Sequence, residues 1–243
     1  MIKVWYCELR KISGLLDNSD IRITIKFGNI FRGKHNLLIP MNSKLLSCFE
    51  RNASVSTRSI QGQVISKHYF SDPKRLDAHL QSLLQERSPE CSAPYLPGFT
   101  LMDKFKHLHY YYVVTAEINE KGASRTTEDF VIQALENFWE YLDDNPSNDL
   151  PLSLPLIGCG QGRLIDKQER MLRNIVQSFI THIRKKNTSP VKDLIVFIPF
   201  QSLLHNSVDV IKIKQFIGYV CSEPFPNKHC TKPLRGGLGS IVV

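Results

Sequence analysis

The chain has 243 residues, of which 42% are hydrophobic and 22% are charged, and these values exclude a collagen-like, low-complexity or wholly disordered protein. Lys and Arg outnumber Asp and Glu by 31 to 23, which gives a formal net charge of +8. This excess predicts an anionic partner: a nucleic acid, an acidic membrane surface or a phosphorylated small molecule.

The first half of the chain alternates predicted strands and loops. Alternating β-branched residues predict a half-buried strand over 21–27, and an apolar run predicts a covered strand over 37–41. Residues 50–66 are rich in Ser, Thr, Asn and Gln, so we expect irregular backbone there. Leucines at helical spacing predict a helix over 73–86, and aromatic and β-branched residues predict a strand over 110–117.

The second half predicts strands that alternate with helices. A helix capped by Thr126 and ended by Asn145 and Pro146 precedes a strand over 152–157 and a glycine-rich turn. A helix over 166–186, a strand over 194–200 and a helix over 207–220 complete the series. This order predicts an α/β layered fold with a mostly parallel sheet. The absence of a repeat or a long linker favours one domain over two.

The cysteines and the termini limit the class of protein further. Six cysteines without a Cys-x-x-Cys pair are too sparse for a disulfide scaffold, so we expect reduced thiols and a cytoplasmic protein. Cys221, His229 and Cys230 lack a second ligand pair, and we expect no metal site. No run of about 18 apolar residues is present, and the N-terminal segment is too short and mixed for a signal peptide.

The sharpest local signal is the turn with glycines at 158, 160 and 162, between a predicted strand and a predicted helix. Glycines allow a phosphate to approach the backbone closely, and exposed N–H groups and a helix N-terminus bind its charge. The spacing matches neither a Walker loop nor the dinucleotide fingerprint. The segment therefore predicts an anion cradle, with an ordinary tight turn as the alternative.

Polar residues form a second candidate cluster at 28–30, 42–43 and 59–63, at or after predicted strand ends. Ligands of parallel α/β sheets bind outside the carboxyl ends of the strands, so we expect these loops to converge with the glycine turn. Ordinary turn chemistry is the alternative for each segment.

These segments carry a family resemblance. Gly28-Asn29-Ile30, an apolar strand running into Asn42, and the sequence from Pro155 to Gly162 resemble the macro domain. With Ser59-Ile-Gln-Gly62 and the helix over 130–139 added, the chain is most similar to the macro domain of the Thoeris anti-phage effector ThsA, over about residues 20–200. A single domain over 1–243 with a C-terminal extension over 201–243 is therefore expected.

The resemblance implies a three-layer α/β/α fold, with a mixed and mostly parallel central sheet, that binds ADP-ribose or an ADP-ribose conjugate without a further cofactor. It implies that Asn29 stands where most macro domains have an Asp that recognises adenine, that Asn42 meets the distal ribose, and that residues 158–162 hold the diphosphate. The candidate ligand-binding residues are Gly28, Asn29, Ile30, Asn42, Ser43, Ser59, Ile60, Gln61, Gly62, Gly158, Cys159, Gly160, Gln161, Gly162 and Arg163. A neutral amide at Asn29 is expected to change adenine recognition, because a carboxylate accepts hydrogen bonds more strongly.

Three functions remain open on the sequence. The first is a sensor without turnover, in bacterial anti-phage defence, for an ADP-ribose-type signal that a TIR-domain partner makes from NAD. Signal binding would act through a homo-oligomer or another effector equilibrium. Membrane-associated relatives carry hydrophobic helices before the macro domain, and none precedes it here, so we expect a solitary sensor or an excised piece.

The second function is an ADP-ribosyl hydrolase in which Asn42 positions a water, although the nearest histidines in the sequence, His35 and His68, are expected on the surface. The third is nucleic-acid binding through a basic cluster around the helix over 166–186, with Tyr110 to Tyr112 as stacking residues. A solvated charged face and a buried strand are the alternatives for these two features.

Overall fold

A computed structural model describes residues 11–48, 55–87, 90–119, 123–159, 168–204 and 208–223. The strands are β1 (Lys11–Leu15), β2 (Arg22–Phe27), β3 (Asn36–Asn42), β4 (Thr100–Phe105), β5 (Leu108–Ile118), β6 (Ser124–Arg125), β7 (Leu152–Pro155) and β8 (Asp193–Ile198). The helices are α2 (Ile60–His68), α3 (Pro73–Arg87), α4 (Glu128–Asp144), α5 (Gln168–Lys186), α6 (Phe200–Leu204) and α7 (Val210–Ser222).

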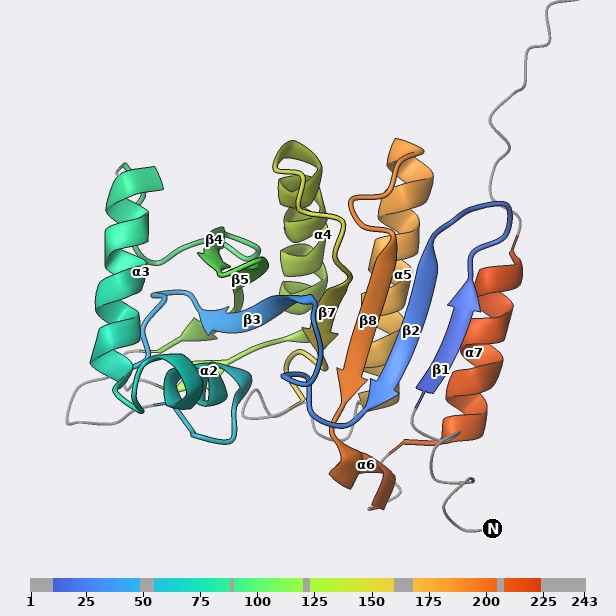
Figure 1. Ribbon diagram of the computed structural model, residues 1–243, viewed down its shortest axis with the longest axis horizontal. Helices are drawn as coiled ribbons and strands as arrows, with labels where there is room; N and C mark the ends of the chain where they lie inside the picture. The colour runs from blue at the N-terminus through green and yellow to red at the C-terminus, as the bar shows by residue number, and fades with distance from the viewer. Residues whose placement is uncertain are drawn as a thin grey trace, which may run out of the picture.

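One mixed sheet forms the centre of the molecule, in the order β1-β2-β8-β7-β3-β5-β4, with β6 paired to β5 (Figure 1). The neighbours from β2 through β8, β7 and β3 to β5 are all parallel, whereas β1, β4 and β6 are antiparallel to their partners. The carboxyl ends of the five parallel strands therefore meet at one edge of the sheet, beside α2 and α6.

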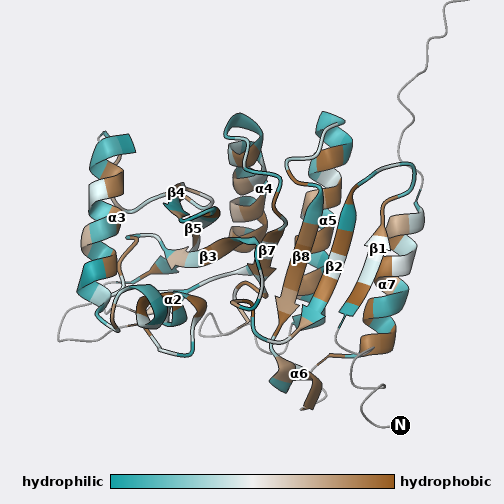
Figure 2. Cartoon of the chain, in the orientation of Figure 1, coloured by the Kyte–Doolittle hydropathy of each residue, from teal (hydrophilic) through white to brown (hydrophobic). Residues whose placement is uncertain are grey.

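Helices cover the two faces of the sheet and give two apolar cores. One core joins α4, α5 and α7 to side chains that include Ile25, Val113 and Val196. The other joins α2 and α3 to Ile39, Tyr112 and Phe197. Figure 2 shows the middle of the sheet coloured hydrophobic, while the helices turn hydrophilic residues outward. The predicted three-layer α/β/α fold with a mostly parallel sheet is confirmed.

Most predicted elements are present, with shifted ends. The strand predicted over 152–157 ends at Pro155, and the one over 194–200 ends at Ile198. Thr127, not Thr126, caps α4: its Oγ1 accepts the Phe130 N–H at 3.2 Å, while the Thr126 hydroxyl donates to the Thr115 carbonyl at 2.7 Å. The helix predicted over 207–220 begins at Val210 because Asp209 is its N-cap.

The prediction of irregular backbone over 50–66 was wrong from Ile60 onward, where α2 begins. Ser59 is the N-cap, and its Oγ accepts the Gly62 N–H at 3.0 Å. A Cβ added to Gly62 would lie 2.1 Å from the Ser56 carbonyl oxygen, so only glycine lets the helix approach this loop. Polar residues and a glycine hid the helical pattern, although Val64 and Ile65 are buried.

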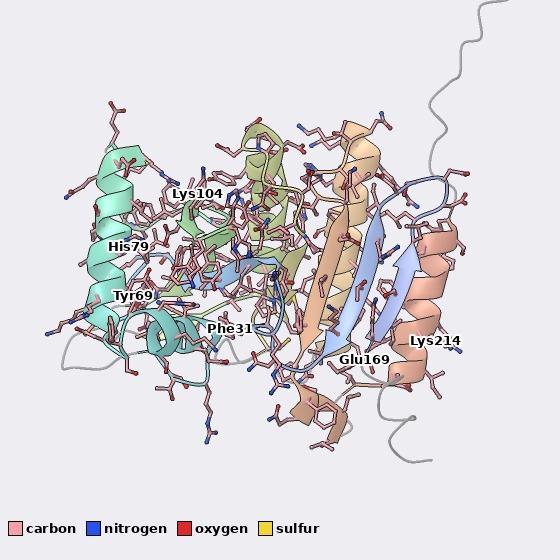
Figure 3. The ribbon with its side chains drawn as sticks, viewed as in Figure 1. Phe31, Tyr69, His79, Lys104, Glu169 and Lys214 are labelled. Atoms are coloured by element: carbon pink, nitrogen blue, oxygen red, sulfur yellow. The ribbon has the colours of Figure 1, made fainter. Side chains whose placement is uncertain are left out.

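The antiparallel strands β1, β4 and β6 were not predicted. The first of them, β1, packs against α7. A Cβ added to Gly14 in β1 would lie 2.4 Å from Cys221 Sγ of α7, so the glycine lets α7 pack closely on this strand. At the other end of α7, the Glu169 carboxylate accepts the Asp209 N–H at 2.5 Å. Figure 3 labels Glu169 near the lower ends of the strands.

Within the described ranges, no helix has both the length and the hydropathy needed to cross a bilayer.

Candidate functional site

A cavity of about 1340 Å³ lies at the carboxyl ends of the parallel strands. The ends of β2, β3, β7 and β8, the last third of β5 and the start of α2 all contribute to its lining. The predicted residues that line it are Gly28, Asn29, Ile30, Asn42, Ser59, Ile60, Gln61, Gly158 and Cys159. The polar loops and the first part of the glycine turn thus come together in space, as a parallel sheet requires.

The remaining predicted residues divide into two groups. Ser43 and Gly62 do not line the cavity: the Ser43 hydroxyl accepts the Ile118 N–H at 3.3 Å, and Gly62 packs against the loop before α2. Gly160, Gln161, Gly162 and Arg163 lie outside the described residues. Of the glycine turn, the structure therefore describes only its start, where Gly158 has a positive φ of 78°.

The loop after β2 forms one wall of the cavity. Gly28 has a φ of 147°, and a Cβ added there would meet no atom within 4 Å, so its peptide borders open space. Asn29 is exposed, and its Oδ1 accepts the Phe31 N–H at 2.8 Å. One lone pair of the amide oxygen is thus used within the loop, and no described residue accepts the Nδ2 hydrogens.

Phe31 ties this wall to α2. The Lys67 ammonium of α2 lies 5.3 Å from the centroid of the Phe31 ring, a cation–π distance. Figure 3 labels Phe31 beside α2. The loop after β2 and the helix that follows β3, which both contribute lining residues, therefore contact each other.

Asn42 lines the cavity, but its side-chain amide is engaged mostly in hydrogen bonds to the backbone. Its Nδ2 donates to the Leu46 carbonyl at 2.6 Å, and its Oδ1 accepts the N–H groups of Lys44 and Leu46 at 3.1 and 3.3 Å. The register between β3 and β5 shifts at Met41 and Asn42, which skips Thr115. Because a bulge of this kind redirects side chains, Thr115 and Ala116 also face the cavity.

A carboxylate in α3 fixes the turn that follows Asn42. The two oxygens of Asp77 accept the N–H groups of Ser47 and Cys48 at 2.7 and 3.0 Å. Burial raises the pKa of Asp77, and these hydrogen bonds oppose that rise. The Gln61 amide donates to Ser47 Oγ at 2.8 Å, so α2 and α3 both hold this turn. No sequence motif pointed to Asp77, because its partners are backbone groups of a distant loop.

The charge of the cavity is positive. Lys11, Lys26, Arg32 and Arg58 line it, and among its described lining residues there is no Asp, Glu or His. The Cys159 thiol stays protonated, since burial raises its pKa to about 12. Gln168, at the start of α5, also lines the cavity, and its buried Oε1 has no hydrogen-bond partner among the described residues. The four cations come from separate segments, so no sequence motif identified them.

Two histidines were expected on the surface, which is wrong for His35 and only partly met by His68. His35 is only 6% exposed and its ring packs 5.6 Å from that of Phe197, so burial, and to a lesser degree Lys26, lower its pKa. His68 is half-buried, and its Nε2 lies 3.2 Å from the Tyr110 hydroxyl. Neither lines the cavity.

The features that suggested nucleic-acid binding are engaged within the protein. Tyr110, Tyr111 and Tyr112 are at most 6% exposed, which leaves no ring face for a base. The basic residues of α5 are largely paired: Arg170 with Glu128 at 2.6 Å, Arg184 with Glu223 at 2.6 Å, Lys185 with Glu140 at 3.8 Å, and Arg173 against the Phe216 ring.

Comparison with solved structures identifies the fold. The macrodomain of Oceanobacillus iheyensis with ADP is 17% identical and superposes with a TM-score of 0.53 over 84% of this chain and 95% of its own. The same macrodomain with MES bound is 16% identical, with a TM-score of 0.54 over 86% and 97%. The fold is therefore that of a macro domain, as expected.

Sequence comparison identifies the family. No curated protein matches the chain. The model of the family described as Thoeris protein ThsA, Macro domain, matches residues 23–199. This range includes the loop after β2, the turn after Asn42 and the glycine turn. Since this match covers well over half of the sequence, the chain belongs to the family of Thoeris ThsA macro domains.

Proposed function

We propose that the cavity binds an ADP-ribose-type nucleotide, and that the chain is a sensor for a signal that a TIR-domain partner makes from NAD in anti-phage defence. One observation carries the proposal: four cations and no carboxylate, among the described residues, surround a cavity at the carboxyl ends of five parallel strands. A diphosphate is an anion that such a site attracts, since backbone N–H groups and cations both donate to it.

The two ends of the cavity suit the two ends of such a nucleotide. In this proposal the Gly158 turn, at the end of β7 in the middle of the sheet, holds the diphosphate. Asn42, Thr115 and Ala116 then lie toward the distal ribose, and the loop containing Asn29 lies toward the adenine. Family membership and the ADP named for the Oceanobacillus iheyensis macrodomain both support a ligand of the ADP-ribose type.

A hydrolase is the second candidate, and the lining gives it less support. Hydrolysis of a glycosidic bond needs a general acid or base near neutral pKa. The described lining offers no carboxylate or imidazole, and its thiol is held protonated. Release of ADP-ribose from a modified protein that is lost in Asn42→Ala would favour the hydrolase over the sensor.

The binding proposal is tested by filling the cavity. Ala116 is a small residue of its lining, and Ala78 is an exposed alanine of α3 outside it. Calorimetry with ADP-ribose should show binding by the parent protein and by Ala78→Phe, and none by Ala116→Phe with an unchanged melting temperature. Equal binding by all three, or none by the parent, would overturn the proposal.

The signalling part needs its own experiment. The protein is incubated with the products that a TIR-domain enzyme makes from NAD, and mass spectrometry identifies what it retains. We expect an ADP-ribose derivative. Retention of unreacted NAD alone would argue against a sensor of the TIR product.

A further inference from the structure

Two lysines face each other at one end of the cavity. Lys11 of β1 and Lys26 of β2 are directly opposite in the antiparallel pair, and both line the cavity. Like charges in that arrangement destabilise a sheet. Within the described ranges neither lysine is close enough to a carboxylate to form an ion pair. The fold thus accepts a repulsive pair at a place where a ligand has access.

A third cation lines the cavity from the loop after β2, and an aromatic ring supports Lys26. Arg32, in the loop after β2, lines the cavity, and its N–H donates to the Asn29 carbonyl at 3.1 Å. The Lys26 ammonium lies 5.8 Å from the centroid of the Phe197 ring, which restrains the lysine side chain. We call Lys11 and Lys26 the basic end. Two ammonium groups without a carboxylate suit a compact dianion such as a phosphate monoester.

The basic end is separate from the glycine turn. Strands β2 and β1 lie two and three positions from β7 in the sheet, which at the usual strand spacing is about 10 and 14 Å. A diphosphate held at the Gly158 turn therefore lies away from Lys11, which is at the edge of the sheet. An anion that contacts both lysines is then best supplied by a different group, carried on the part of the nucleotide that reaches past β8 toward β1.

We propose that the basic end is a second anion subsite, which takes a phosphate monoester on the adenosine ribose. This inference rests on the proposed function, because that function sets the direction in which the adenosine extends. The preferred ligand is then a 2′-phosphorylated ADP-ribose, of the kind that cleavage of NADP rather than NAD supplies. In dinucleotide-binding folds an arginine beside the adenosine ribose accommodates such a phosphate, and we expect the two lysines to supply the positive charge here.

Calorimetry on the full chain tests the subsite by comparing ADP-ribose with ADP-ribose 2′-phosphate. We expect the phosphorylated ligand to bind at least about tenfold more tightly, as charge-assisted hydrogen bonds would give. This ratio should fall to near one in the double variant Lys11→Gln/Lys26→Gln. It should be kept in Lys34→Gln/Lys44→Gln, which removes two exposed charges that do not line the cavity. The single variant Lys11→Gln, at an exposed position, gives a second test if the double variant fails to fold.

The outcomes separate this inference from the proposed function. If the parent protein binds both nucleotides equally, the subsite is wrong while ADP-ribose binding stands. If it binds neither, both proposals fail. A single-stranded oligonucleotide that competes as strongly as ADP-ribose 2′-phosphate, and does so through Lys11 and Lys26, would overturn the subsite in favour of a nucleic-acid surface.

Discussion

Different interactions hold two regions of the molecule together: the layer of α4, α5 and α7, and the turn after Asn42, which we call the polar wall of the cavity. Behind the sheet, Phe138, Trp139 and Phe179 are completely buried and pack ring against ring, with centroids 5.2 and 5.3 Å apart. At the cavity, Asn42, Gln61 and Asp77 hold a turn by hydrogen bonds to its backbone and to Ser47. The apolar layer stabilises the fold, whereas the polar wall sets the shape of the site.

The largest effect should come from the apolar layer. Trp139→Ala removes a buried ring and the hydrogen bond from Nε1 to Ser178 Oγ at 3.1 Å, so we expect a loss of about 3–5 kcal/mol in the free energy of unfolding, measured by urea denaturation. Leu96→Ala, at a side chain that is 76% exposed, should cost less than about 0.5 kcal/mol. Similar losses in both variants would show that burial in the apolar layer does not account for the stability of the fold.

A smaller loss of stability is expected from a change in the polar wall, the turn after Asn42. Asp77→Ala leaves the N–H groups of Ser47 and Cys48 without their acceptor, which should cost about 1–3 kcal/mol in unfolding and should also weaken ADP-ribose binding. Asp77→Asn, which keeps one acceptor, should lie between the parent and the alanine variant. Glu86→Ala, at an exposed position of the same helix, serves as the control. If Asp77→Ala lost stability but kept its affinity, the turn would not shape the site.

The smallest effect should be a change in ligand affinity alone. Asn29→Asp keeps an oxygen for the Phe31 N–H and replaces the outward amide by a second acceptor, so we expect ADP-ribose to bind about fivefold more tightly, roughly 1 kcal/mol. The hypoxanthine analogue lacks the adenine amino group and should gain nothing. Calorimetry with both nucleotides checks this, and an equal gain for both would show that residue 29 does not contact the base.

The comparison also explains which parts of the fold were predictable. Long apolar segments such as β5 and α4 were recognised because burial on a sheet imposes a period that reads directly from the sequence. The helix α2 was missed because its few apolar residues are mixed with polar ones that hold the neighbouring turn. The strand β1 was missed because Gly14 is there to admit α7, a contact about 200 residues further along the chain.

The sequence by itself determined the alternation of strands and helices, the mostly parallel sheet and the segments that resemble a macro domain, because these depend on local periodicity and on short motifs. Only the tertiary structure decided which of those segments share one cavity, that Asn29 Oδ1 accepts the Phe31 N–H, and that Lys11 lies opposite Lys26. The reason is that strand order brings together residues far apart in the chain. Charge at a site is the sum over such neighbours, whereas net charge is a sum over the whole sequence.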